Sequence, residues 1–204
     1  PMDRLSGLDA SFLYLETPAQ LMHVCGVLVI DPSTMPEPYE FEKMRSAIDA
    51  QVRTVPSFTK KLRRVPLGLD HPIWVADRQF DIERHVHRLA LPSPGGYQEL
   101  TTLIGHLAGL PLDRSRPLWE MWIVEGYDDG KIVVFLKMHH ATVDGVSTWN
   151  IGDQIVFGPS AWKRVVITYT SSTDIPLTSL SAIATATFVG NNSGGTASPS
   201  ALSV

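Results

Sequence analysis

Residues 132–145 read IVVFLKMHHATVDG, and the rest of the chain is interpreted around them. Residues 132–136 form a run of apolar, β-favouring side chains, which predicts a buried strand. Two adjacent histidines, His139 and His140, follow where this strand should end. Because neighbouring residues of an extended chain point to opposite sides, at most one of the two imidazoles faces a given cavity. An imidazole at the mouth of a pocket is well suited to accept a proton near neutral pH.

The segment before this strand predicts its neighbour in a sheet. Residues 119–124 alternate in polarity, and Asp128-Asp129-Gly130 is a typical hairpin turn. The resulting hairpin places His139 at the exit of a central strand, an argument that needs only local sequence.

Further elements are expected to pack around this hairpin. Residues 22–30 are rich in valine and isoleucine and predict a strand. Residues 39–55 and 97–110 carry apolar side chains at spacings of three and four, which predicts two helices lying on the sheet. Pro56 and Pro111 should end them.

Residues 72–75 and 81–86 are expected to be extended pieces. In a strand, His85 and His87 would share a face and resemble half a metal site. No third ligand lies at close spacing, so both are interpreted as surface or structural residues.

The histidine pair itself allows two interpretations. One is a pair of satisfied structural histidines followed by an ordinary Asp-Gly turn. The other is a catalytic loop, in which Asp144 orders the neighbouring ring and Gly145 permits a turn that other residues resist. The spacing His-His-x-x-x-Asp-Gly at a strand end is far more specific than a histidine pair, and it favours function.

The segment His139-His140-x-x-x-Asp144-Gly145 resembles the signature of the CoA-dependent acyltransferase superfamily. Two other stretches resemble one branch of it, the bacterial wax ester synthase/diacylglycerol acyltransferases. They are the opening LSGLDASF of residues 5–12, followed by Met-His-Val at residues 22–24, and the tripeptide Pro117-Leu118-Trp119. The resemblance covers about residues 3–148.

The resemblance implies a chloramphenicol acetyltransferase-like α/β fold of the two-layer α+β type, with a mixed sheet packed with helices. It implies that residues 1–150 are the N-terminal acyltransferase domain of a two-domain enzyme. A later motif built around Asn-Asp is missing, so a C-terminal half-domain is an expected partner. Residues 151–204 lose the resemblance and are expected to be a crossover or partial segment.

The resemblance also implies the chemistry. His140 would be the general base, while His139 and Asp144 hold the loop and Gly145 leaves space beside the base. Structural support is expected from the tripeptide Pro117, Leu118 and Trp119. Acyl-CoA would be a co-substrate and diacylglycerol or a fatty alcohol the acceptor, with no cofactor and no metal.

The composition limits the possible binding partners and cellular compartment of the protein. The net charge of -4 over 204 residues gives no electrostatic case for nucleic acid. Cys25 is the one cysteine, so no internal disulfide can form, and a buried thiol in a reducing cytosol is expected. The N-terminus lacks the pattern of a signal peptide. No apolar run approaches the ~20 residues of a membrane span, so any contact with membranes or lipid droplets is expected to be peripheral.

Three alternatives remain open at this stage. A basic run, Lys60, Lys61, Arg63 and Arg64, is expected to be a solvated edge strand, although attraction of CoA phosphates or anionic lipid is the sharper interpretation. The chain could be a half-domain that binds without catalysing. It could also be a related acyltransferase that serves polyketide or peptide carriers.

Overall fold

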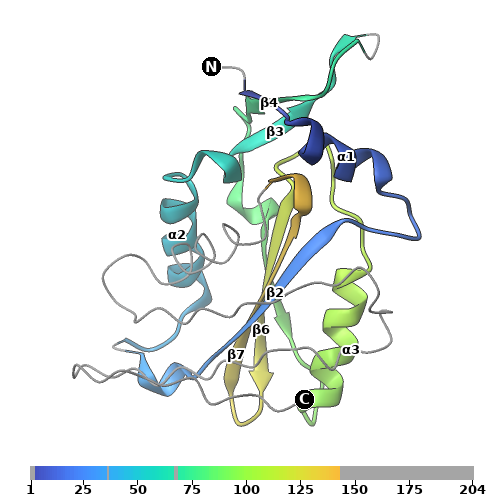
Figure 1. The fold of residues 1–204 in the computed structure, drawn as a ribbon. Coiled ribbons are helices and arrows are strands. Elements are labelled where there is room, and N and C mark those ends of the chain that lie inside the picture. Colours follow the sequence, from blue (N-terminus) through green and yellow to red (C-terminus); the bar gives the residue numbers. More distant parts are fainter. Residues whose placement is uncertain (1–2, 36, 67–68, 143–204) are drawn as a thin grey trace, which may run out of the picture.

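The computed structural model describes residues 3–35, 37–66 and 69–142. Within these residues the main sheet has four strands in the order β2-β7-β6-β5. Figure 1 labels β2, β6 and β7 at its centre. The four strands are β2 (His23–Ile30), β5 (Val86–Ala90), β6 (Trp119–Tyr127) and β7 (Lys131–His139). Strand β5 runs parallel to β6, whereas the other neighbours are antiparallel. The sheet is therefore mixed, as the family resemblance implied.

The hairpin of β6 and β7 forms where the sequence predicted it. Asp128, Asp129 and Gly130 all have positive φ, at 37°, 63° and 90°, which is the backbone that tight hairpin turns require. Strand β7 lies between β2 and β6 and is buried from Ile132 to His139. The predicted central strand is confirmed.

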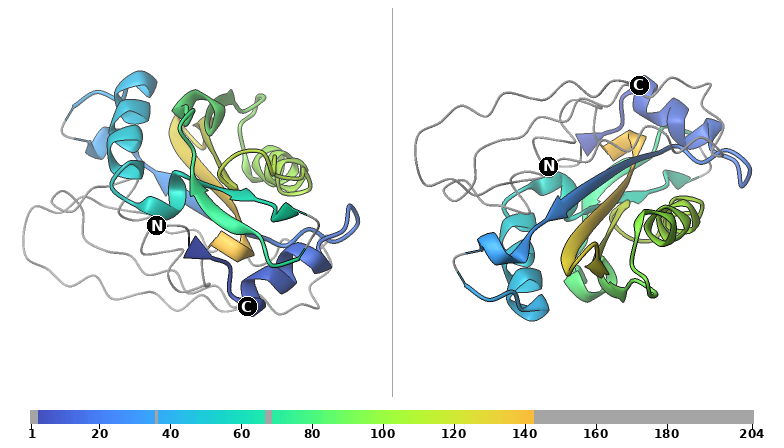
Figure 2. Two further views of the ribbon diagram at one scale, coloured as in Figure 1. Left: turned by 90° about the horizontal axis from the view of Figure 1, so that it is seen from above. Right: turned by 90° about the horizontal axis from the view of Figure 1, so that it is seen from below.

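Helices α2 (Phe41–Val52) and α3 (Tyr97–Ala108) cover opposite faces of this sheet (Figure 2). Alternate side chains of β7 pack on opposite faces of the sheet, because successive side chains of a strand point to opposite sides. Val134 packs in the core that includes Ile48 of α2, and Val133 packs in the core that includes Ile104 of α3. The mixed α/β class is confirmed, and within it the sheet forms a layer between these two helices.

A second, smaller sheet carries the N-terminus. It has the order β1-β4-β3, formed by β1 (Asp3–Arg4), β3 (Lys60–Arg63) and β4 (Ile73–Ala76). Lys60, Lys61 and Arg63 of the basic run therefore lie on an edge strand of this sheet, in line with the solvated-edge interpretation, and Arg64 follows the strand. Helix α1 (Gly7–Leu15) follows β1, and the Ser6 side chain caps it by accepting from the Asp9 amide.

Short 3₁₀ turns connect these elements at η1 (Pro32–Thr34), η2 (Pro56–Phe58), η4 (Ile82–Arg84) and η5 (His140–Thr142). The turn at η4 corrects the expectation that residues 81–86 are extended. The Asp81 carboxylate accepts from the Glu83 amide and so begins a helical turn, a local bond that competes with a strand. His85 ends this turn and His87 lies in β5, so the two do not share the face of one strand.

The expected boundary at residue 150 and the expected segment 151–204 lie outside the described residues.

Candidate active site

Strand β7 delivers the two histidines to one end of the sheet. His139 is its last residue and pairs in register with His23 of β2, while His140 begins the turn η5. His139 is 1% exposed, whereas His140 is half-buried. The structure therefore separates the two rings into one interior and one accessible imidazole, as expected for adjacent residues at a strand end.

Both ring nitrogens of His139 face a defined neighbour. The Ala141 amide donates to Nδ1 at 3.0 Å, so the ring hydrogen belongs on Nε2. Nε2 lies 3.1 Å from the Oε2 atom of Glu16. Burial lowers the pKa of His139 to about 4, even though the Glu16 carboxylate opposes this shift. His139 is therefore a neutral ring at physiological pH.

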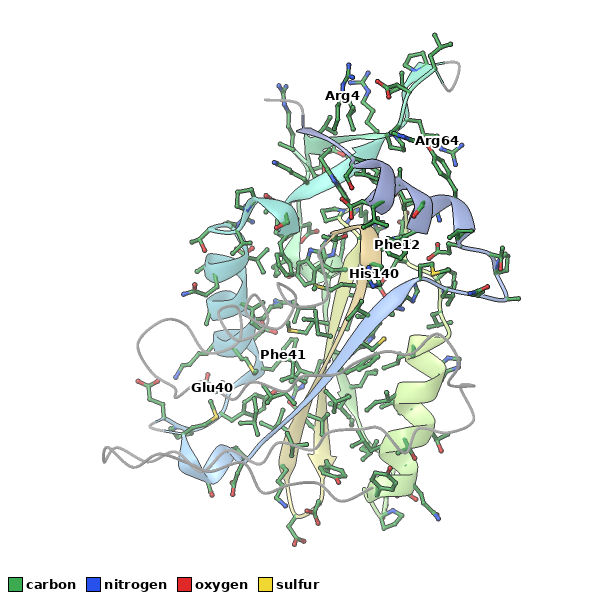
Figure 3. All side chains as sticks on the ribbon, in the orientation of Figure 1. Arg4, Phe12, Glu40, Phe41, Arg64 and His140 are labelled. Atoms are coloured by element: carbon green, nitrogen blue, oxygen red, sulfur yellow. The ribbon has the colours of Figure 1, made fainter. Side chains whose placement is uncertain are left out.

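His140 is held through its backbone and its ring. Its amide donates to the Met22 carbonyl at 2.8 Å, which ties η5 to the start of β2. Its imidazole stacks on the ring of Phe12 from α1, with centroids 4.1 Å apart and planes 24° apart. Figure 3 shows the two labelled residues next to each other beneath α1. The accessible imidazole is thus placed by two elements far from it in sequence.

The tripeptide Pro117-Leu118-Trp119 lies under this turn. Leu118 and Trp119 are fully buried. The Leu118 carbonyl accepts from the His139 amide at 3.0 Å, and the Trp119 indole donates to the Phe58 carbonyl at 2.9 Å. These contacts are with backbone and core, and they connect the tripeptide directly to the histidine pair.

In the other histidine pair, His85 belongs to the core and His87 is half-buried on β5. His85 is 2% exposed, its Nδ1 lies 2.8 Å from the Trp119 carbonyl, and its ring stacks on that indole at 4.6 Å. Burial lowers the pKa values of both His85 and His87. Within the described ranges, no group of histidine, cysteine, aspartate and glutamate side chains is arranged to hold a metal ion.

A polar cavity of about 270 Å³ lies beside His85 rather than His140. Lys61 and Asp77 line it and already pair with each other at 3.0 Å.

Sequence reasoning missed the groups that surround His139. Glu16 and His23 lie close in sequence, but Arg114 and His139 are far from them, so the four groups meet only through the fold. No periodicity or spacing in the sequence marks them as a set. The predicted site residues Asp144 and Gly145 lie outside the described residues. None of the helices in the described part of the chain is both long and apolar enough for a membrane span.

Two solved structures have a fold similar to that of this chain. The starter condensation domain of rhizomide synthetase matches 78% of this chain and 38% of its own, with a TM-score of 0.61 and 12% identity. At this identity the likeness concerns the fold alone. A wax ester synthase/diacylglycerol acyltransferase from Marinobacter aquaeolei VT8 matches 74% of this chain and 37% of its own, with a TM-score of 0.61 and 31% identity.

Sequence comparison gives the family. Residues 5–160 match the profile described as the wax ester synthase/diacylglycerol acyltransferase catalytic domain. A Mycobacterium tuberculosis protein, provisionally named a diacylglycerol O-acyltransferase, is 52% identical over 151 residues, which are 74% of this chain and 30% of that protein. The chain belongs to the wax ester synthase/diacylglycerol acyltransferase family. It spans about a third of the length of these relatives.

Proposed function

We propose that this chain carries the catalytic histidine of an acyl-CoA-dependent O-acyltransferase, which moves a long-chain acyl group to diacylglycerol or a fatty alcohol. Family membership supports the reaction class. The observation that carries the residue assignment is the division of the histidine pair. His139 is buried and neutral, its Nδ1 accepts from the Ala141 amide and its Nε2 faces Glu16, whereas His140 is half-buried at the end of the central strand.

The proposed step moves one proton and exchanges one bond. His140 accepts the proton of the acceptor hydroxyl, and the hydroxyl oxygen attacks the thioester carbonyl. The tetrahedral intermediate collapses, the carbon–sulfur bond breaks, and the imidazolium returns the proton to the CoA sulfur. A positioned general base contributes roughly 10²–10⁴ in rate.

The remaining motif residues receive supporting roles in this proposal. His139 and Asp144 hold the loop, and Gly145 leaves space beside the base. Leu118 and Trp119 support the turn structurally, because the Leu118 carbonyl accepts a hydrogen bond from the His139 amide. The reaction as proposed uses acyl-CoA as co-substrate, with no further cofactor and no metal.

The proposed setting is the cytoplasm, with peripheral contact to membranes or lipid droplets and with a C-terminal half-domain as partner. Helix α1 exposes Leu8, Tyr14 and Leu15, which are 70%, 62% and 60% accessible. The exposed Arg4 and Arg64 lie at the same end of the molecule (Figure 3). Apolar side chains beside cations suit an anionic lipid surface. Flotation with anionic vesicles should fall when Leu8 and Leu15 become serine, and unchanged flotation would remove this part of the proposal.

The test of the catalytic assignment is His140→Ala in the full-length gene product, with release of CoA from a long-chain acyl-CoA as the readout. We expect kcat to fall by roughly 10²-fold or more, because the proton acceptor is lost. His106→Ala, a change at an exposed position on α3, is the matched control and should retain activity. Undiminished thioester consumption by His140→Ala would refute the assignment. The same assay with acyl groups on a carrier protein in place of acyl-CoA tests the alternative enzyme, an acyltransferase that serves polyketide or peptide carriers. Activity with the carrier-bound donor alone would favour that alternative.

A further inference from the structure

The carboxylate of Glu16 connects four groups beneath the histidine turn. Its side chain is 9% exposed. Oε1 accepts from the Arg114 guanidinium at 2.8 Å, and Oε2 accepts from the Met22 amide at 3.1 Å. The same Oε2 lies 3.1 Å from Nε2 of His139 and 3.7 Å from Nε2 of His23. One buried carboxylate thus joins α1, β2, β7 and the loop before β6.

The charge of this carboxylate is balanced within the cluster. Burial alone would raise the pKa of Glu16, but the hydrogen bonds from Arg114 and the Met22 amide, together with His139, hold it below the ordinary value. Burial and the positive charge of Lys137 lower the pKa of His23. At neutral pH the cluster therefore contains an ionised Glu16 paired with Arg114, and two neutral imidazoles.

Glu16 is connected to His140 by hydrogen bonds through the backbone of Met22. The Met22 amide donates to Glu16, and the Met22 carbonyl accepts from the His140 amide at 2.8 Å. On the other side, Nδ1 of His139 accepts from the Ala141 amide, while the opposite edge of the ring faces Glu16. The amides of two successive residues in η5 are therefore fixed by groups that Glu16 contacts.

A third connection runs through α1. Glu16 is the residue that ends this helix, and its amide donates to the Phe12 carbonyl at 3.2 Å. The Phe12 ring stacks on His140. The position of the Glu16 side chain therefore also sets where the end of α1, and with it Phe12, lies relative to the accessible imidazole.

We infer that Glu16 is a positioning residue for His140, holding Met22 and packing against the ring of His139 so that η5 presents the His140 ring in a single orientation. The inference rests on the proposed role of His140. Glu16 itself acts through other residues and does not touch the reacting atoms. A displacement of a catalytic group by about 1 Å can reduce a rate by roughly 10²-fold, so a fixed turn has a large kinetic consequence.

The experiment compares Glu16→Ala, Glu16→Asp and Glu16→Gln in the full-length gene product with long-chain acyl-CoA and diacylglycerol. Alanine removes the carboxylate, and aspartate keeps the charge but withdraws it by one methylene. Both should lower kcat by about 10- to 100-fold with KM within about twofold of the wild type. Glutamine can still accept from the Met22 amide and fills the same space beside His139, so it should recover most of the rate. Glu42→Ala, which removes an exposed carboxylate paired with Arg45, is the matched control and should leave kcat unchanged.

A spectroscopic readout separates positioning from simple stability. The ring ¹H and ¹³C shifts of His140, which the stacked Phe12 ring perturbs, should be alike in the wild type and the Gln variant and should move toward those of an unstacked imidazole in the Ala variant. Wild-type kcat in Glu16→Ala, or in Glu16→Asp if the Ala variant does not fold, would overturn the inference. So would unchanged His140 ring shifts in a folded Ala variant. If His140→Ala is inactive in the same assay while Glu16→Ala is fully active, this inference fails alone; an active His140→Ala refutes the proposed function instead.

Discussion

The buried His139 should make the stability of this protein depend on pH between about 4 and 6.5. The pKa of His139 is lowered to about 4 in the fold from an ordinary value of 6.5, mainly by burial and against the pull of Glu16. Below the ordinary value the unfolded chain binds a proton that the folded ring refuses, so the free energy of unfolding falls as pH falls. The loss from this one ring is about 2 kcal/mol between pH 7.5 and pH 5, with a slope approaching about 1.4 kcal/mol per pH unit.

The variant His139→Asn isolates this contribution. Asparagine can still accept from the Ala141 amide but does not titrate, and the distant His85 is present in both proteins and cancels in the difference. Urea unfolding, followed by the fluorescence of the buried Trp119 and Trp122, gives the free energy of unfolding at each pH. The gap between wild type and variant should be constant above about pH 7.5 and change by about 2 kcal/mol by pH 5. Parallel curves over this range would refute the neutral, buried assignment of His139.

Two further predictions concern the support of the sheet. Lys137 is fully buried, and its ammonium donates to the carbonyls of Leu107 and Leu110 at the end of α3, so Lys137→Met should lower the free energy of unfolding by about 2–4 kcal/mol. Lys131→Met, a change at a more accessible ion pair, should lower the free energy of unfolding by clearly less in the same urea titration, and equal losses would contradict the argument. Gly95 has φ +76°, and a Cβ there would lie 2.3 Å from a backbone oxygen. Gly95→Ala should therefore lower the thermal midpoint by several degrees, corresponding to about 1–3 kcal/mol, and an unchanged midpoint would show that the turn can adapt.

The elements that the sequence specified well are those whose signal is local. The apolar run of β7, the Asp128-Asp129-Gly130 turn and the amphipathic stripes of α2 and α3 each depend on residues within a few positions of one another. Local side-chain bonding also explains the main error. The cap made by Asp81 turned an expected extended piece into a 3₁₀ turn.

The candidate site divides in the same way. The sequence by itself determined that two adjacent imidazoles leave a buried central strand, because strand geometry sends neighbouring side chains to opposite sides. Only the tertiary structure decided which imidazole is buried, and that Glu16 and Phe12 of the N-terminal segment meet the pair. The physical reason is that contacts across more than a hundred residues depend on how helices and strands dock. The local spacing of residues therefore does not predict how these elements pack together.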